Sequence, residues 1–142
     1  MSTNSKNKTK DKTKDKTKDK TTKPFVAKIE KITKENTAYR KSADTGIHLQ
    51  LVLMSLAPGE EIGAETHAHV DQFFRIEAGV ALAIVDGVKY KLKKDDVIIV
   101  HAGSLHNIIN RSKTTALKLY TIYAPPNHTG KCVQQRKTNK EC

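Results

Sequence analysis

The sequence predicts an all-β domain, folded as a barrel or a two-sheet sandwich. From residue 25 onward, apolar residues recur mostly with period two, which is the pattern of half-buried β-strands. Gly, Pro, Asn and Asp separate these short runs and favour tight turns. Only residues 31–40 permit a helical turn, with Thr33 as its expected cap. Many short strands without a long helix are typical of β-barrels and sandwiches.

Turn signals divide the domain into eight expected strands. These strands cover residues 49–56, 62–68, 72–78, 80–85, 88–92, 97–100, 106–110 and 117–123. The pair Asp86-Gly87 between two of them predicts a type I′ hairpin. The short apolar run at 97–100 is interpreted as a buried strand. Pro125-Pro126 is expected to end the domain.

The positive charge of the chain is concentrated at its two ends. The formal charge is +11, of which residues 1–23 contribute +6 through nine Lys and three Asp. Residues 127–142 contribute a further +3, so residues 24–126 are close to neutral. We therefore divide the chain into a disordered Lys-rich tail (1–23), a folded domain (24–126) and a basic C-terminal tail (127–142). The first tail is interpreted either as a solvated segment or as a tether for nucleic acid.

Cysteine usage and hydropathy suggest a compartment. Cys132 and Cys142 both lie in the C-terminal tail and form no CxxC pair, so we expect two free thiols in a reducing environment. No apolar leader precedes the domain, and no apolar run is long enough to span a bilayer. We expect a soluble intracellular protein, in the cytoplasm, with no membrane partner.

A histidine–carboxylate constellation carries the chemical signal of the sequence. Glu65 and His67 stand two residues apart in an expected strand, so their side chains should leave the same face. Burying both would cost on the order of several kcal/mol without a partner, and a divalent metal takes oxygen and nitrogen ligands together. Gln72 opens the next strand with a carbonyl oxygen, and His106 begins a later strand after the turn at 102–105.

These spacings resemble the first motif of the cupin superfamily, G-x5-H-x-H-x3/4-E-x6-G. The matching positions are Gly59, Glu65, His67, Gln72 and Gly79. Glu65 replaces the first motif histidine, and Gln72 replaces the motif glutamate. Pairing His67 with His69 instead leaves only two residues before Gln72 and places no carboxylate at the required position.

The second cupin motif, G-x5-P-x-G-x2-H-x3-N, is also matched in spacing. Its positions correspond to Asp95, His101, Gly103, His106 and Asn110, of which the last three keep the usual residue. The strings at residues 71–77 and 119–126 are similar to those of small single-domain cupins (cupin type 2) related to phosphomannose isomerases. This resemblance covers about residues 28–126. It implies a jelly-roll (RmlC-like) β-barrel with an internal metal site.

The resemblance implies four metal ligands, namely Glu65, His67, Gln72 and His106. Two His, one Glu and a neutral amide suit Mn, Fe, Ni or Zn without deciding between these divalent metals. Four further residues are expected around the ligands or lining the pocket: His69, Phe74, Ile76 and Asn110. The alternative is a site that has lost its metal and forms a hydrogen-bonded polar core.

Three functions remain open from the sequence, because fold alone does not decide function. The chain is either a small metal-dependent enzyme, isomerase-like or dioxygenase-like, or a non-catalytic ligand-binding cupin, or a scaffold whose basic tail binds nucleic acid. The resemblance favours a sugar or another small oxygenated compound as the ligand. The apolar faces of residues 49–56 would permit a homodimer. No catalytic residue is predicted.

Overall fold

The computed structural model describes residues 23–138 and confirms a mostly β domain. Its elements are α2 (Ile29–Glu35), β1 (Arg40–Thr45), β2 (Gln50–Leu56), β3 (Asp71–Ala78), β4 (Val80–Val85), β5 (Val88–Lys93), β6 (Val97–Val100), β7 (His106–Asn110), β8 (Leu117–Ala124) and β9 (Val133–Gln134). No helix within the described part is long and apolar enough to cross a membrane. Residues 1–22 lie outside it, so the disorder expected for the N-terminal tail stays a prediction.

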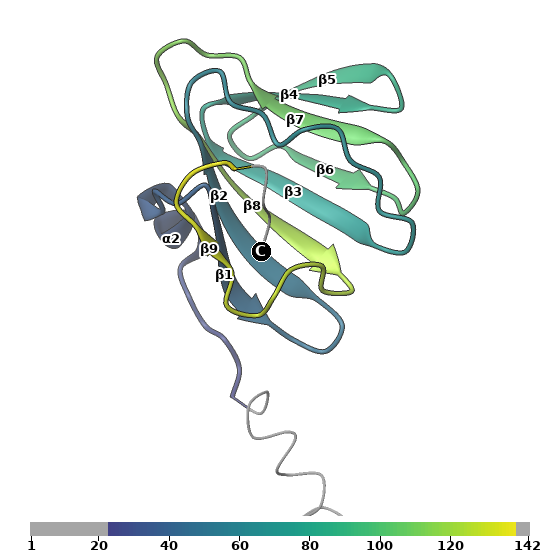
Figure 1. The fold of residues 1–142 in the computed structure, drawn as a ribbon. Helices are drawn as coiled ribbons and strands as arrows, with labels where there is room; N and C mark the ends of the chain where they lie inside the picture. Colours follow the sequence, from purple (N-terminus) through teal and green to yellow (C-terminus); the bar gives the residue numbers. More distant parts are fainter. Residues whose placement is uncertain (1–22, 139–142) are drawn as a thin grey trace, which may run out of the picture.

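The strands form two antiparallel sheets stacked as a sandwich (Figure 1). The larger sheet has the order β6-β3-β8-β2-β1-β9, and the smaller sheet has the order β5-β4-β7. The loop between β2 and β3 runs along β7, which it contacts through isolated bridges at Glu61–Ile109 and Glu65–His106. The sheets therefore build a two-layered jelly roll, which confirms the jelly-roll fold that the resemblance to cupins implied, with β5 and β6 left unpaired to each other within residues 23–138.

Alternation along each strand decides which side chains enter the space between the sheets. The core consists mainly of Val52, Met54, Leu56, Phe74, Ile76, Ile108, Leu117 and Leu119. Among the polar residues on the inward faces of these strands, three are linked through Gln72: Gln72 on β3, His106 on β7 and Thr121 on β8. All three are buried, so they must find partners inside the sandwich.

Three local predictions are wrong. Residues 62–68 form no strand, because Gly63 adopts a φ of 103°, which an extended strand does not use. β6 exposes Val97 and Ile99, because its side chains alternate and only Ile98 and Val100 turn toward the core. The helix α2 begins before Thr33, which is buried within the helix and does not cap it. The type I′ hairpin, by contrast, is confirmed by positive φ at both of its central residues.

Helix α2 is tied to the outer face of the larger sheet by a lysine of β8. The Lys118 ammonium donates to the carbonyl oxygen of Asn36, at the C-terminus of α2, at 2.6 Å and to the hydroxyl of Ser55 at 2.9 Å. Burial lowers the pKa of Lys118, because the charged form loses water contacts there. A cation near a helix C-terminus is also favoured by the helix dipole.

Residues 127–138 continue the packed chain beyond the proline pair, where a tail was expected. β9 pairs with β1, and the buried amide of Gln50 donates to the His128 carbonyl at 2.9 Å and accepts from the His128 N–H at 2.9 Å. Cys132 is buried and disulfide-bonded, so the expectation of two free thiols is wrong. A strand of two residues has no periodicity, which is why sequence patterns do not reveal it.

Candidate metal centre

Two polar side chains project from the facing sheets toward each other. Gln72 is the second residue of β3 in the larger sheet, and His106 opens β7 in the smaller sheet. They are almost inaccessible, with 2% and 4% of their surfaces exposed. The Nε2 atom of His106 lies 3.2 Å from Oε1 of Gln72. Strand pairing therefore holds one imidazole against one amide between the sheets.

The loop between β2 and β3 supplies the other two predicted ligands. The main chains of Glu65 and His106 exchange two hydrogen bonds of 2.9 Å, which align the loop with the first residue of β7. The carbonyl of His67 accepts from the Gly103 N–H at 2.8 Å, so the loop is also tied to the turn before β7. Oε2 of Glu65 lies 3.1 Å from Nε2 of His67, and these side chains are 19% and 17% exposed. The loop thus adds a partly accessible acid–imidazole pair.

The spacing of the cluster suits a single cation. Glu65, His67 and His106 each offer one atom that could bind a metal, and these three atoms lie within 4.8 Å of one another. Metal–ligand bonds of about 2.0–2.2 Å place the donors of one ion about 3 to 4.4 Å apart, which this arrangement permits. Because Gln72 touches His106, all four predicted ligands lie in one group.

Hydrogen bonds determine how His106 and Gln72 offer their lone pairs. His106 Nδ1 lies 3.0 Å from the Ser104 carbonyl, which can only accept, so Nδ1 carries the proton and donates. In the neutral ring, Nε2 then bears a lone pair. Gln72 Nε2 donates to the Thr121 hydroxyl at 3.0 Å, which turns Oε1 of Gln72 toward that lone pair. Two acceptors at this distance need a cation or a proton between them.

The residues expected around the ligands lie in different places. Phe74 is buried, and its ring centroid is 6.2 Å from that of His106, so it forms an apolar wall of the cluster. Ile76 belongs to the hydrophobic core, two positions further along β3. Asn110 is buried at the far end of β7 and donates to three main-chain carbonyls of neighbouring segments. His69 is exposed.

Two aromatic residues that sequence patterns did not assign to the site lie beside it. Tyr123 is buried on β8, and its ring meets that of His67 edge-on at 6.1 Å. The His128 Nε2 lies 3.2 Å from the Tyr123 hydroxyl. Tyr123 and Thr121 stand two residues apart and share the inward face of β8, so the period-two pattern of the sequence could have placed Tyr123 beside the site. His128 lies in the C-terminal segment, where no pattern points to it.

The fold and the cluster together define a class of protein, a small two-sheet jelly roll with a histidine–glutamate group between its sheets. The family described as "Cupin domain" matches residues 52–123, a range that includes the four predicted ligands. This chain belongs to the cupin domain family.

Similar sequences occur in bacteria and in a virus. The chain is 46% identical over 123 residues to YrkC of Bacillus subtilis (strain 168), a match that covers 82% of this chain and 66% of YrkC. It is 45% identical over 107 residues to a protein of Acanthamoeba polyphaga mimivirus, covering 73% and 67%. The chain thus spans about two thirds of the length of these relatives. The crystal structure of BH2720 from Bacillus halodurans is 41% identical, with a TM-score of 0.78, and the match covers 81% of this chain and 91% of that one.

Proposed function

We propose that this chain binds one divalent transition metal through Glu65, His67, Gln72 and His106. The observation that carries the proposal is the closeness of His106 Nε2 and Gln72 Oε1, which lie 3.2 Å apart beside the side chains of Glu65 and His67. A shared cation would satisfy all four side chains at once. One carboxylate, two imidazoles and an amide oxygen suit Mn²⁺, Fe²⁺, Ni²⁺ or Zn²⁺.

The site supports an enzyme that acts on a small oxygenated compound such as a sugar, by isomerase-type or dioxygenase-type chemistry. A bound metal would supply Lewis acidity toward a carbonyl or hydroxyl oxygen of that compound. Glu65 and His67 are partly exposed whereas the strand-borne ligands are buried, so the compound approaches from the loop side. The rings of Phe74 and Tyr123 flank the two histidines of the cluster, and the Tyr123 hydroxyl contacts His128. An apolar wall with a few convergent polar groups is typical of sites for small molecules.

Metal titration tests the site. Chelator-treated protein should bind one equivalent of metal per chain, and His106→Ala should abolish this binding. His101→Ala is the matched control, because His101 is an exposed histidine in the turn before β7, and it should still bind one equivalent. Substoichiometric metal after reconstitution, or equal loss in both variants, would contradict the proposal.

Two partner expectations stay predictions. A homodimer would use the outer face of the larger sheet, where Leu51, Phe73 and Ile122 are half-buried in the single chain. Binding of nucleic acid would use residues 1–23 and should weaken steeply with added salt.

A further inference from the structure

The sandwich leaves one pair of sheet edges open. Each sheet has two edge strands. In the smaller sheet, the loop between β2 and β3 bridges the edge strand β7 at Glu61 and Glu65. In the larger sheet, one edge is the short strand β9, which has only two residues. β5 and β6 each pair with one strand only and, within residues 23–138, not with each other. Proteins usually cover or block such edges, because unpaired main-chain groups invite another strand. The open seam between β5 and β6 therefore needs an explanation.

The hydrogen bonds of Lys93 show which residues of β5 face the open side. Its N–H donates to the Asp96 carboxylate and its carbonyl accepts from the Asp96 N–H, both at 2.9 Å, so both groups point away from β4. Main-chain direction alternates along an antiparallel strand, so the same groups of Lys91 and Lys89 point the same way. No main-chain group of the described chain pairs with them. An added strand could bond to both residues.

The same residues carry a row of cations. The side chains of Lys89, Lys91 and Lys93 are exposed at alternate positions, about 6.6 Å apart along the strand. No carboxylate of residues 23–138 forms an ion pair with them. Asp95, which follows β5 closely, pairs with Arg75 at 2.8 Å. The row is therefore electrostatically unpartnered within the described chain.

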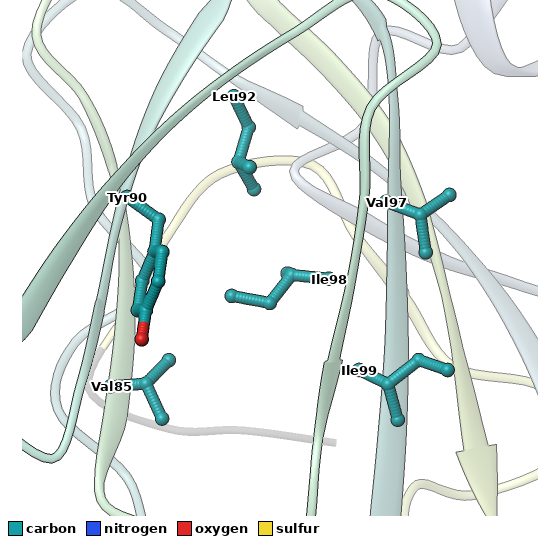
Figure 2. A pocket seen from close by; sticks show the side chains of 6 residues that line it. All are labelled: Val85, Tyr90, Leu92, Val97, Ile98 and Ile99. Atoms are coloured by element: carbon teal, nitrogen blue, oxygen red, sulfur yellow. The ribbon is translucent and has the colours of Figure 1, made fainter.

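The other face of β5 borders an apolar cleft of about 380 Å³ (Figure 2). Its lining consists of Val85, Tyr90, Leu92, Val97, Ile98 and Ile99. In Figure 2, Ile98 points from β6 toward Tyr90 and Leu92 of β5. Tyr90 is 44% exposed, a large accessible fraction for an aromatic residue on a strand. β5 thus presents lysines on one face and borders an apolar cleft with the other.

We propose that the β5 edge docks an extended acidic segment of a partner protein, in which Asp or Glu alternates with apolar residues. When this segment adds to the sheet as a new strand beside β5, its acidic side chains lie across from Lys89 and Lys91. Opposed Cβ atoms of paired strands are about 4.5–5.5 Å apart. Its intervening apolar side chains enter the cleft, because side chains of a strand alternate between two faces. The basic residues 1–23 and the β5 strand of a second copy carry the same charge as the lysine row, so neither is the occupant.

A synthetic peptide tests the proposal on the full chain. The probe is a fluorescein-labelled seven-residue peptide of alternating Glu and Val, and binding is followed by anisotropy at low salt. One control peptide has the same composition with the Glu and Val residues in separate blocks. A second control is N-methylated at the residues whose N–H groups would face β5. The protein control for Lys91→Glu is Lys41→Glu, which makes the same charge change at an exposed position of strand β1.

The alternating peptide should bind, slow amide hydrogen exchange at Lys89 and Lys91, and lose affinity as salt is added. Lys91→Glu and the N-methylated peptide should each weaken binding at least about tenfold, whereas Lys41→Glu should change it less than about twofold. Equal binding of the block or N-methylated peptide would overturn the proposal, because charge alone would then suffice. It would also be overturned if no peptide binds, since the lysines would then only protect the edge, or if anionic vesicles bind in place of the peptides.

Discussion

Gln72 and His106 differ from Glu65 and His67 in the backbone that carries them. The first pair lies on β3 and β7, whose paired neighbours hold the main chain, and both side chains are nearly inaccessible. The second pair lies on the loop between β2 and β3, which hydrogen-bonds to β7 at several points but forms isolated bridges instead of a continuous ladder, and both side chains are partly exposed. One half of the cluster is thus part of the sandwich, and the other half covers it.

This difference means that the strand-borne pair is held more rigidly, whereas the loop-borne pair is more accessible to solvent. Donors on paired strands are held in place before a metal arrives, which lowers the cost of ordering the site. A loop opens more easily than a paired strand, so metal-binding side chains on a loop are more accessible to a ligand from the solvent. Changes in the strand-borne pair should therefore affect both folding and metal binding, while changes in the loop-borne pair should affect mainly metal binding.

The largest expected effect comes from comparing His106→Ala with His67→Ala. Both should lower metal affinity at least about 100-fold, because each removes a ligand. In metal-free protein, His106→Ala should lower the free energy of unfolding by about 2–4 kcal/mol, since it leaves a cavity and deprives the Ser104 carbonyl of its donor. His67→Ala should cost less than about 1 kcal/mol. Urea denaturation with chelator present measures both values, and equal losses would show that the two pairs are equally rigid.

Much of the fold follows from local pattern. Local hydrophobic pattern and turn signals predicted every strand that contributes a side chain to the hydrophobic core, because burial of one face of a strand imposes a period of two. The expected strand at 62–68 fails because the backbone at Gly63 overrides the side-chain pattern. β1 and β9 were missed: the burial of β1 alternates little, and β9 is too short to show a pattern.

The site was predictable through motif spacing, but only in part. The structure brings Glu65, His67 and His106 within 4.8 Å of one another and Gln72 against His106, as the resemblance to the cupin motifs implied. Motif spacing did not show that Thr121 orients the Gln72 amide, or that His128 approaches Tyr123, because these contacts join segments far apart in sequence. The disulfide of Cys132 was missed for a similar reason, since spacing alone does not separate free from bonded thiols.

A smaller effect is expected at Gln72, where charge can be changed with little change in shape. In metal-free protein, Gln72→Glu places a second carboxylate near Glu65 in a buried position, so it should lower the free energy of unfolding by about 2–3 kcal/mol. With metal present, the added anion should tighten Mn²⁺ binding by about tenfold. Gln72→Ala should lose less affinity than His67→Ala, because an amide oxygen is the weakest donor of the four. Metal titrations on the three variants measure these differences. If Gln72→Glu leaves the affinity unchanged and Gln72→Ala is silent, Gln72 is not a ligand and His69 is the next candidate.

The smallest effect should come from loosening the loop without touching a ligand. The Asn107 side chain accepts from the Gly63 N–H at 2.8 Å and donates to the Glu61 carboxylate at 3.0 Å, so it holds the loop on β7 just before Glu65. Asn107→Ala removes both hydrogen bonds and should lower metal affinity about three- to tenfold, because the loop-borne donors must then be ordered on binding. Amide exchange should accelerate in residues 61–67 and stay unchanged in β3. Glu61→Ala is the matched control, since it removes the Asn107–Glu61 hydrogen bond and keeps the Asn107 acceptor for Gly63, so its metal affinity should fall between those of the parent chain and of Asn107→Ala. Faster exchange of the loop with unchanged affinity would show that the strand-borne pair alone determines how tightly the metal is held.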